Sequence, residues 1–288
     1  MPYLKDEDIS HWDLERPRRT DRRKPKANRT RRDLLLAPNE ERLTSTSEFS
    51  DPGMQSLYDR GYFDSFIGEL KGGKEATVFL VGLGEQRLAA KVYTDLAVRG
   101  FRNDAVYWSD FYIGDARVKK AMQQHSRAGQ KAQQEVWVLR EYFHLWRLHQ
   151  AGLKVPKPAV GPEVSAYGDA GAVVLMQFIG EGDLPAPRLS DIKLAADEAK
   201  EAFNQTVELL AALTRLGVVH GDLSTYNLLW HEGEVWLIDL PQMVDLKASR
   251  VGPELLGRDI KSLATSFRRL GVFAAEAVLQ RAVAAARR

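Results

Sequence analysis

The sequence predicts a compact α+β protein with two lobes, a small β-rich N-terminal lobe and a mainly helical C-terminal lobe. Three observations support this fold class. Short apolar runs separated by glycine-containing turns occupy residues 66–93, a pattern typical of an antiparallel sheet. Apolar residues recur at helical spacing through much of residues 194–288. A stretch rich in Gly and Pro at residues 180–187 separates the two regions, and we expect the lobes to meet there.

Composition narrows the class of protein further. The chain has 288 residues and 44% hydrophobic content, enough for one sizeable core or two modest cores that share an interface. The absence of Cys excludes disulfides, thiolate zinc sites and thiol chemistry. The N-terminus is charged, and no apolar run approaches the length of a membrane span. We therefore expect a cytoplasmic protein with no membrane partner.

Residues 1–50 form a basic segment that we predict to be disordered. The formal net charge is only +2, but ten Lys and Arg residues and a single acid lie between Arg16 and Arg32. Such a block repels itself and offers little apolar surface to bury. It is a candidate for binding RNA or a ribosomal particle through counterion release. The alternative is a tail that only adds solubility.

The first lobe is placed at residues 51–181. A helix is expected at residues 133–149, and Glu141 lies off its apolar stripe. A flexible inserted loop is expected near residues 95–130, where aromatic residues alternate with basic and small ones. Four apolar runs are expected as strands: 66–67, 76–81, 87–93 and 172–179. The expected helical stripe consists of Val136, Leu139, Phe143, Trp146 and Gln150.

The second lobe is placed at residues 182–288. Amphipathic helices are expected at residues 194–216, 253–270 and 272–288. The first of them directs Phe203, Val207, Leu210 and Leu213 inward. After this helix, two apolar runs flank the turn at residues 231–234 and predict a β-hairpin.

The most informative motif flanks this hairpin: HGDLSTYN at residues 220–227 precedes it, and Asp239 follows it. In the protein-kinase pattern H-R-D-x-x-x-x-N, the Asp receives the acceptor's hydroxyl proton, and the Asn and a later Asp hold metal ions. Asp222, Asn227 and Asp239 occupy those positions. The hairpin brings Asn227 and Asp239 to the same end, and oxygen ligands of this kind suit Mg²⁺. Either fragment alone is more often an ordinary turn, whereas the pair at this spacing indicates phosphoryl transfer from ATP.

Two upstream features fit a nucleotide site. Lys91 ends the run LAAK, which matches the strand V-A-I-K whose lysine contacts phosphates, and Glu141 could pair with that lysine. The loop before this strand, residues 68–78, which we call the flap, matches the kinase glycine pattern only at Gly73. Backbone amides at Gly72 and Gly73 can still approach phosphate oxygens, and Lys74 adds a nearby charge.

These motifs together resemble the RIO family of atypical serine/threonine protein kinases. The resemblance rests on GKEA at 73–76, MQFIG at 176–180, DLPAP at 183–187, the HGDLSTYN motif and IDLPQ at 238–242. The DLPAP element is similar to that of the first RIO subfamily. The resemblance implies a bilobal kinase fold that uses ATP with Mg²⁺ or Mn²⁺ and phosphorylates Ser or Thr, including on itself.

The resemblance also implies roles for particular residues. Asp222 would be the catalytic base, and Lys91 with Glu141 would anchor phosphate. Asp239, besides holding metal with Asn227, would be a candidate to accept phosphate in an ATPase-like cycle. The residues implied to hold adenine are Gln177 and Ile179, through their backbones, beneath the gatekeeper Met176.

Departures from ordinary protein kinases are equally informative. Gly221 replaces the Arg of H-R-D, which in many kinases pairs with a phosphorylated activation loop. Only 49 residues follow Asp239, so an activation segment and peptide-binding subdomains are expected to be missing. Two other classes stay open. One is a small-molecule phosphotransferase of the aminoglycoside or choline type, and the other is an ATP-gated module that binds RNA or ribosomal particles.

Overall fold

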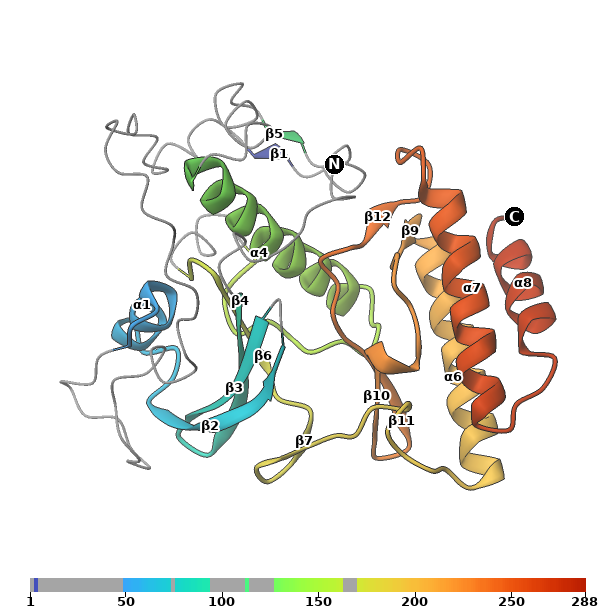
Figure 1. Cartoon of the computed structure of the whole chain (residues 1–288), viewed down its shortest axis with the longest axis horizontal. Helices are drawn as coiled ribbons and strands as arrows, with labels where there is room; N and C mark the ends of the chain where they lie inside the picture. The colour runs from blue at the N-terminus through green and yellow to red at the C-terminus, as the bar shows by residue number, and fades with distance from the viewer. Residues whose placement is uncertain (1–2, 5–48, 74–75, 94–111, 114–126, 163–169) are drawn as a thin grey trace, which may run out of the picture.

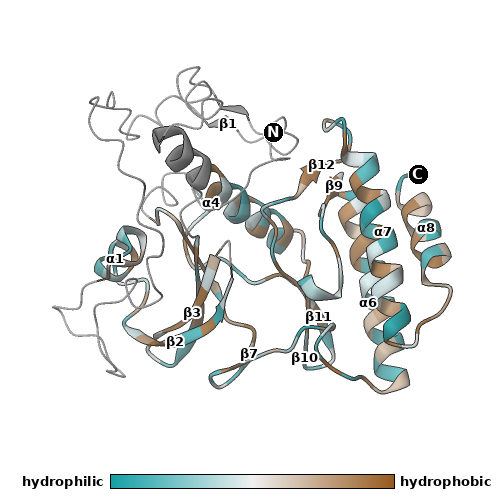
Figure 2. Ribbon diagram, in the orientation of Figure 1, coloured by the Kyte–Doolittle hydropathy of each residue, from teal (hydrophilic) through white to brown (hydrophobic). Residues whose placement is uncertain are grey.

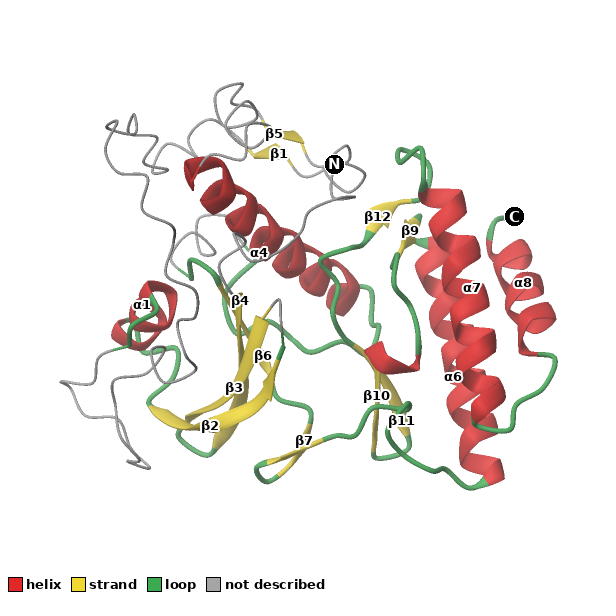
Figure 3. Cartoon of the chain, viewed as in Figure 1, coloured by secondary structure: helices red, strands yellow, loops and turns green. Residues whose placement is uncertain are grey.

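A computed structural model describes residues 3–4, 49–73, 76–93, 112–113, 127–162 and 170–288. It confirms the α+β class: an antiparallel sheet forms one lobe, helices dominate the other, and helix α4 (Arg127–Gln150) lies between them (Figures 1 and 3). The basic stretch at residues 16–32, most of the insertion at 95–130 and Lys74 lie outside the described residues.

The N-terminal lobe is built on a four-stranded antiparallel sheet in the order β2-β3-β4-β6. The strands are β2 (Ser65–Gly72), β3 (Ala76–Leu83), β4 (Gln86–Tyr93) and β6 (Val173–Gln177). All four predicted strands are therefore present, and β2 is much longer than the run at 66–67. A two-residue turn joins β3 to β4, and Gly84 adopts φ +59° there, a conformation that glycine reaches without a steric penalty.

The outer edge of β6 is covered by side-chain and backbone groups. The amide of Leu175 donates to the Tyr142 hydroxyl over 2.8 Å, and the carbonyl of Leu175 accepts from Ala159 N over 2.9 Å. Gln177 N donates to Lys157 O over 2.7 Å. The edge strand thus has partners for its polar groups, which also blocks pairing with other strands.

Helix α4 extends further than the predicted helix and is buried on more than one face. The predicted stripe was wrong in part, because Leu139, Phe143 and Trp146 are only half-buried and Gln150 is exposed. The sheet covers α4 on one side and the C-terminal lobe covers it on the other, so a single-stripe pattern does not apply. The side chains that it buries are Val136, Trp137, Val138, Arg140, Glu141, Tyr142, His144, Leu145 and Leu148.

The C-terminal lobe contains three long helices, all close to their predicted bounds. They are α6 (Ala196–Arg215), α7 (Gly252–Arg269) and α8 (Ala275–Ala286). Hydrophilic and hydrophobic residues alternate along α7 (Figure 2), as expected of a helix that buries one stripe. The predicted hairpin is formed by β10 (Leu228–His231) and β11 (Glu234–Leu237).

Short elements complete the chain. The linker between the lobes folds into a small hairpin, β7 (Gly180–Glu181) with β8 (Leu184–Pro185). Its turn residue Asp183 pairs with Arg87 of β4, with 2.6 Å between Nε and Oδ1. The remaining elements are α1 (Pro52–Asp59), η4 (Thr225–Asn227), the pair β9 (Val218–Val219) and β12 (Val244–Asp245), and the parallel pair β1 (Tyr3–Leu4) and β5 (Tyr112–Ile113). Within the described ranges, none of the helices has the length and hydropathy of a bilayer span.

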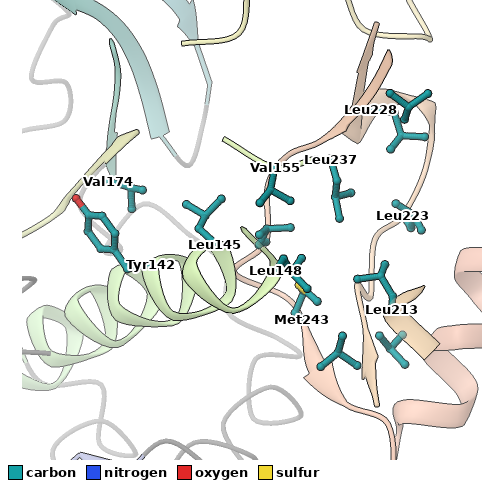
Figure 4. Close-up of a cluster of buried hydrophobic side chains, with 14 of the residues drawn as sticks. Tyr142, Leu145, Leu148, Val155, Val174, Leu213, Leu223, Leu228, Leu237 and Met243 are labelled. Carbon is teal, nitrogen blue, oxygen red and sulfur yellow. The ribbon is translucent and has the colours of Figure 1, made fainter. Parts of the chain in front are cut away.

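One continuous hydrophobic core runs through both lobes. Figure 4 shows Leu145 and Leu148 of α4 beside Val155, which lies in the connection from α4 to β6, and Leu237 of β11. These side chains are almost fully buried. The lobes are therefore joined by packing as well as by the linker.

The contact between Tyr142 and β6 leads to a stability prediction. Replacing Tyr142 with Phe removes the acceptor of the buried Leu175 amide, which should lower the free energy of unfolding by about 1–3 kcal/mol. Urea titration followed by circular dichroism measures the change. Tyr226→Phe is the control, since that side chain is half-exposed, and equal stability of the two variants would contradict the prediction.

His144 leads to a second prediction, about pH. Burial, reinforced by the charges of Arg140 and Arg147, holds the pKa of His144 well below its ordinary value. In the unfolded chain the group titrates near pH 6.5, so below that pH the unfolded state binds the proton more readily and stability falls. The loss should approach about 1.4 kcal/mol per pH unit.

Urea midpoints at pH 7.5 and 5.5 test this dependence. His144→Gln should reduce the difference between the two midpoints, whereas the same change at the half-buried His149 should leave it as in the unaltered protein. A His144→Gln variant with the full pH dependence would contradict the assignment.

Candidate active site

A cavity of about 470 Å³ lies between the sheet and the β10–β11 hairpin. Charged residues that line it include Lys91, Glu141 and Asp239. Apolar residues from both lobes complete the wall, among them Val78, Ala89, Met176, Ile179, Leu229 and Ile238. Such a cavity suits a ligand with a flat apolar part and a strongly polar part.

Lys91 of β4 connects three separate segments of the chain. Its Nζ lies 2.8 Å from Glu141 Oε1 on α4 and 2.8 Å from Asp239 Oδ1, which follows β11. Tyr93 points to the same side of the strand as Lys91, and its hydroxyl donates to Glu141 Oε2. The Lys91 ammonium also lies 4.9 Å from the centroid of the Tyr93 ring. The pairing predicted between Lys91 and Glu141 is therefore present.

The electrostatics of this cluster favour its charged form. Burial alone would lower the pKa of Lys91, but the carboxylates of Asp239 and Glu141 outweigh it and raise the pKa well above the ordinary value. Burial would raise the pKa of Asp239, and Lys91 reverses that effect and lowers it. The side chain of Asp239 is 47% exposed because it faces the cavity. Lys91 is therefore a cation and Asp239 an anion at neutral pH.

Backbone contacts hold Asp239 beside the loop that contains Asp222. Ile238 N donates to Asn227 O over 3.0 Å, and Ile238 O lies 3.2 Å from Nε2 of the buried His220. Asp239 itself adopts φ +66°, which is costly for a residue other than glycine, by about 1–3 kcal/mol. Strain of this kind persists where surrounding contacts impose it, and it is common at functional sites.

Asp222 and Asn227 lie together at the start and end of this loop. Asn227 Nδ2 donates to Asp222 O over 2.9 Å and lies 3.4 Å from Asp222 Oδ2. Between them, Ser224 caps the single 3₁₀ turn η4, with its Oγ accepting from Tyr226 N over 3.3 Å. Burial raises the pKa of Asp222 above its ordinary value, although nearby His220 opposes the shift. Although Asp222 is exposed, partial desolvation of its carboxylate makes it a somewhat better proton acceptor than an ordinary carboxylate.

Sequence reasoning missed Asp259, whose carboxylate binds two backbone amides of the loop that contains Asp222. This buried residue of α7 accepts from Gly221 N over 2.9 Å and from Leu223 N over 2.8 Å. Gly221 adopts φ +86°, which orients its amide in a conformation that other residues rarely take. A signal was present in the sequence, since Asp259 is a lone acid among the apolar stripe residues Leu255, Leu256, Ile260 and Leu263. Tyr93 was also missed, because nothing in the sequence pairs it with Glu141.

The three residues expected to hold adenine, Met176, Gln177 and Ile179, all line the cavity. Met176 lies opposite Ala89 in the β4–β6 register. Within the described part of the chain, the N–H of Ile179 has no hydrogen-bond partner, although its carbonyl accepts from Ala186 N over 2.9 Å. A buried free amide in a cavity wall fits a ligand with an acceptor nitrogen.

The flap is placed only in part. Gly73 lines the cavity, whereas Gly72 ends β2 outside the lining, and Lys74 lies outside the described residues. The amide of Gly73 donates to Ala76 O over 2.9 Å, and a Cβ at Gly73 would also lie 2.9 Å from that oxygen. The tight turn therefore requires glycine at this position.

The donor set of the site fits a hard cation bound partly by phosphate. Asn227 uses its amide nitrogen on Asp222, and Asp239 uses Oδ1 on Lys91, so among the described residues Asn227 Oδ1 and Asp239 Oδ2 have no partner. No group of three or more His, Cys, Asp or Glu side chains in the described ranges could hold a metal alone. Mg²⁺ commonly takes one or two protein oxygens and completes its shell with phosphates and water.

Comparison with known proteins agrees with this geometry. The RIO domain family model matches residues 78–279. A RIO-type serine/threonine-protein kinase Rio1 of Haloferax volcanii is 34% identical over 78% of this chain and 72% of its own length. Serine/threonine-protein kinase RIO3 of Homo sapiens is 30% identical over 76% of this chain but only 41% of its own length. Serine/threonine-protein kinase RIO1 of Caenorhabditis elegans is 29% identical over 91% of this chain and 47% of its own length. The cluster around Lys91, the loop from His220 to Asn227 and these matches lead to one conclusion: the chain belongs to the RIO domain family.

Proposed function

We propose that this protein is a serine/threonine protein kinase that uses ATP and Mg²⁺. The observation that carries the proposal is the position of Lys91 Nζ, 2.8 Å from both Glu141 and Asp239 in the wall of the cavity. In protein kinases the same arrangement of lysine, helix glutamate and metal-binding aspartate aligns the phosphates of ATP. The relatives' names, which include serine/threonine-protein kinase, support the same reaction class.

In the proposed reaction, Asp222 accepts the proton of a Ser or Thr hydroxyl as the hydroxyl oxygen attacks the γ-phosphorus. The bond between that phosphorus and the β–γ bridging oxygen breaks, and ADP leaves. Asn227 and Asp239 would hold Mg²⁺, which neutralises charge on the phosphates. Lys91 stabilises the charge on the α- and β-phosphates, and Glu141 keeps Lys91 in place. The free amide of Ile179 and the backbone of Gln177 would hold the adenine ring.

Several finer features belong to the same proposal. We propose that the chain belongs to the first RIO subfamily, because its DLPAP element at residues 183–187 is similar to the one in that group. Autophosphorylation and an ATPase-like cycle through Asp239 are proposed on the family resemblance, as is a cytoplasmic location. RNA or ribosome binding is assigned to residues 16–32, from their charge alone.

We also propose that phosphorylation of an activation loop does not switch this enzyme on. Gly221, at φ +86°, stands where many kinases have the Arg that reads such a phosphate. Helix α7 begins at Gly252, which leaves few residues between Asp239 and that helix for an activation segment. Ser or Thr substrates must then be recognised by other surfaces.

Labelled ATP with Mg²⁺ tests the proposal directly. The protein is incubated alone, with generic protein acceptors and with aminoglycosides, and labelled products are identified by mass spectrometry. Phosphoserine or phosphothreonine on protein supports the kinase assignment. Faster labelling of an aminoglycoside would instead indicate a small-molecule phosphotransferase.

A substitution of Asp222 tests the proton acceptor. Asp222→Asn should lower phosphate transfer by about 10²- to 10⁴-fold, because the amide cannot accept the hydroxyl proton. Affinity for ATP, measured by calorimetry, should stay close to that of the unaltered protein. Asp197→Asn, an exposed change on α6, is the matched control. Undiminished transfer in Asp222→Asn would rule out this role.

A substitution of Asp239 tests the metal ligand. In the unaltered protein Mg²⁺ should strengthen ATP binding, and Asp239→Asn should remove most of that gain because the site loses a charged oxygen ligand. Calorimetric titrations with and without Mg²⁺ give the comparison. Asp191→Asn also removes a cavity carboxylate and should keep the gain. The assignment fails if both variants respond to Mg²⁺ alike.

A further inference from the structure

The cavity contains two cations that the proposed mechanism does not use. Lys71 of β2 and Arg188, which follows the linker hairpin, both line it. Lys91 already contacts two carboxylates within 2.8 Å. In the part of the chain that the structure describes, neither Lys71 nor Arg188 makes an ion pair. Their charges are therefore available to an anionic ligand in the cavity.

The backbone fixes the direction of Arg188. The residue pairs with Leu229 in an antiparallel bridge, and flanking hydrogen bonds of 2.9 Å join Leu189 N to Leu228 O and Trp230 N to Pro187 O. Residues directly opposite in such a pairing project to the same face. Leu229 lines the cavity floor, so the half-buried Arg188 side chain enters the cavity beside it.

Lys71 approaches this position from the other lobe. Lys71 is exposed at the mouth of the cavity, and partial desolvation, with the charge of Arg188, lowers its pKa, while Asp191 acts in the opposite direction. Both cations line the same cavity, so their like charges repel one another there. Bringing an anion between them would relieve that repulsion.

We propose that Arg188 binds the non-transferred phosphates of the nucleotide, with Lys71 as a second positive charge above them. The planar guanidinium presents paired donors that match phosphate oxygens. The charge of Lys91 is partly neutralised by Glu141 and Asp239. The charge of Arg188 would therefore add to the attraction that Lys91 exerts on the phosphates. This inference rests on the proposed function, since it concerns the same nucleotide site.

The consequence is a preference for phosphorylated nucleotides over the nucleoside. Removing Arg188 should weaken ATP and ADP binding while leaving adenosine, which lacks phosphate, unaffected. A charge-assisted hydrogen bond contributes enough to predict a loss of about 10- to 100-fold in affinity. Arg188→Lys, which keeps the charge but not the fork, should lose less than Arg188→Met.

Calorimetric titration of the full chain with ATP, ADP and adenosine, all with Mg²⁺, tests the inference. The variants are Arg188→Met and Arg188→Lys, and Lys193→Met is the control for loss of an exposed charge nearby but outside the lining. Thermal melts check that each variant is folded, and Arg188→Lys alone decides if Arg188→Met does not fold. The expected result is a loss for ATP and ADP only, larger than in Lys193→Met.

Two results would overturn the inference. One is unchanged ATP affinity in the folded Arg188 variants, and the other is an equal loss for adenosine, which would mean that Arg188 shapes the cavity and does not contact phosphate. Failure of the unaltered protein to bind ATP at all would instead overturn the proposed function, so the two failures are distinguishable.

Discussion

The ion-pair cluster of Lys91, Glu141 and Asp239 is the constraint on which the arrangement of this molecule depends. Its members come from strand β4, helix α4 and the loop after β11, which are 50 and 98 residues apart along the chain. A buried charge without partners costs several kcal/mol, so none of the three elements can move away without penalty. The sheet, the helix and the hairpin are thus placed correctly only when all three are folded.

Helix α4 is secured to the C-terminal lobe as well as to the sheet. The Arg140 guanidinium donates to Met243 O, and Arg147 Nη2 donates to Leu216 O over 2.7 Å. Leu145 and Leu148 continue the core toward Val155 and the hairpin (Figure 4). In kinases where the equivalent pair of Lys and Glu is a control point, helix position decides whether it forms. Here the anchors hold Glu141 in the paired position.

The sequence predicted local elements and contiguous motifs well, but it predicted contacts across the chain only where a kinase pattern supplied them, as for Lys91 and Glu141. The strands, the hairpin and the loop from His220 to Asn227 follow from period-2 runs, turn residues and fixed spacing, which are local. The support of Asp259 for Gly221 spans 38 residues, and the contact of Tyr93 with Glu141 spans 48. The burial of α4 on several faces could not be read from one stripe, because it depends on which elements cover the helix.

The linker hairpin has a consequence for how the two lobes move. Position 180 has no room for a Cβ, which would lie 2.2 Å from Leu184 O. Ala186 N donates a hydrogen bond to Ile179 O at the base of the hairpin. The exposed pair of Arg87 and Asp183 adds little stability, about 0–1 kcal/mol, but it ties the hairpin to β4. A linker that is hydrogen-bonded to itself in this way can adopt fewer conformations than an extended linker. The hairpin and its contact with β4 therefore restrict the backbone conformations through which the two lobes could turn relative to one another.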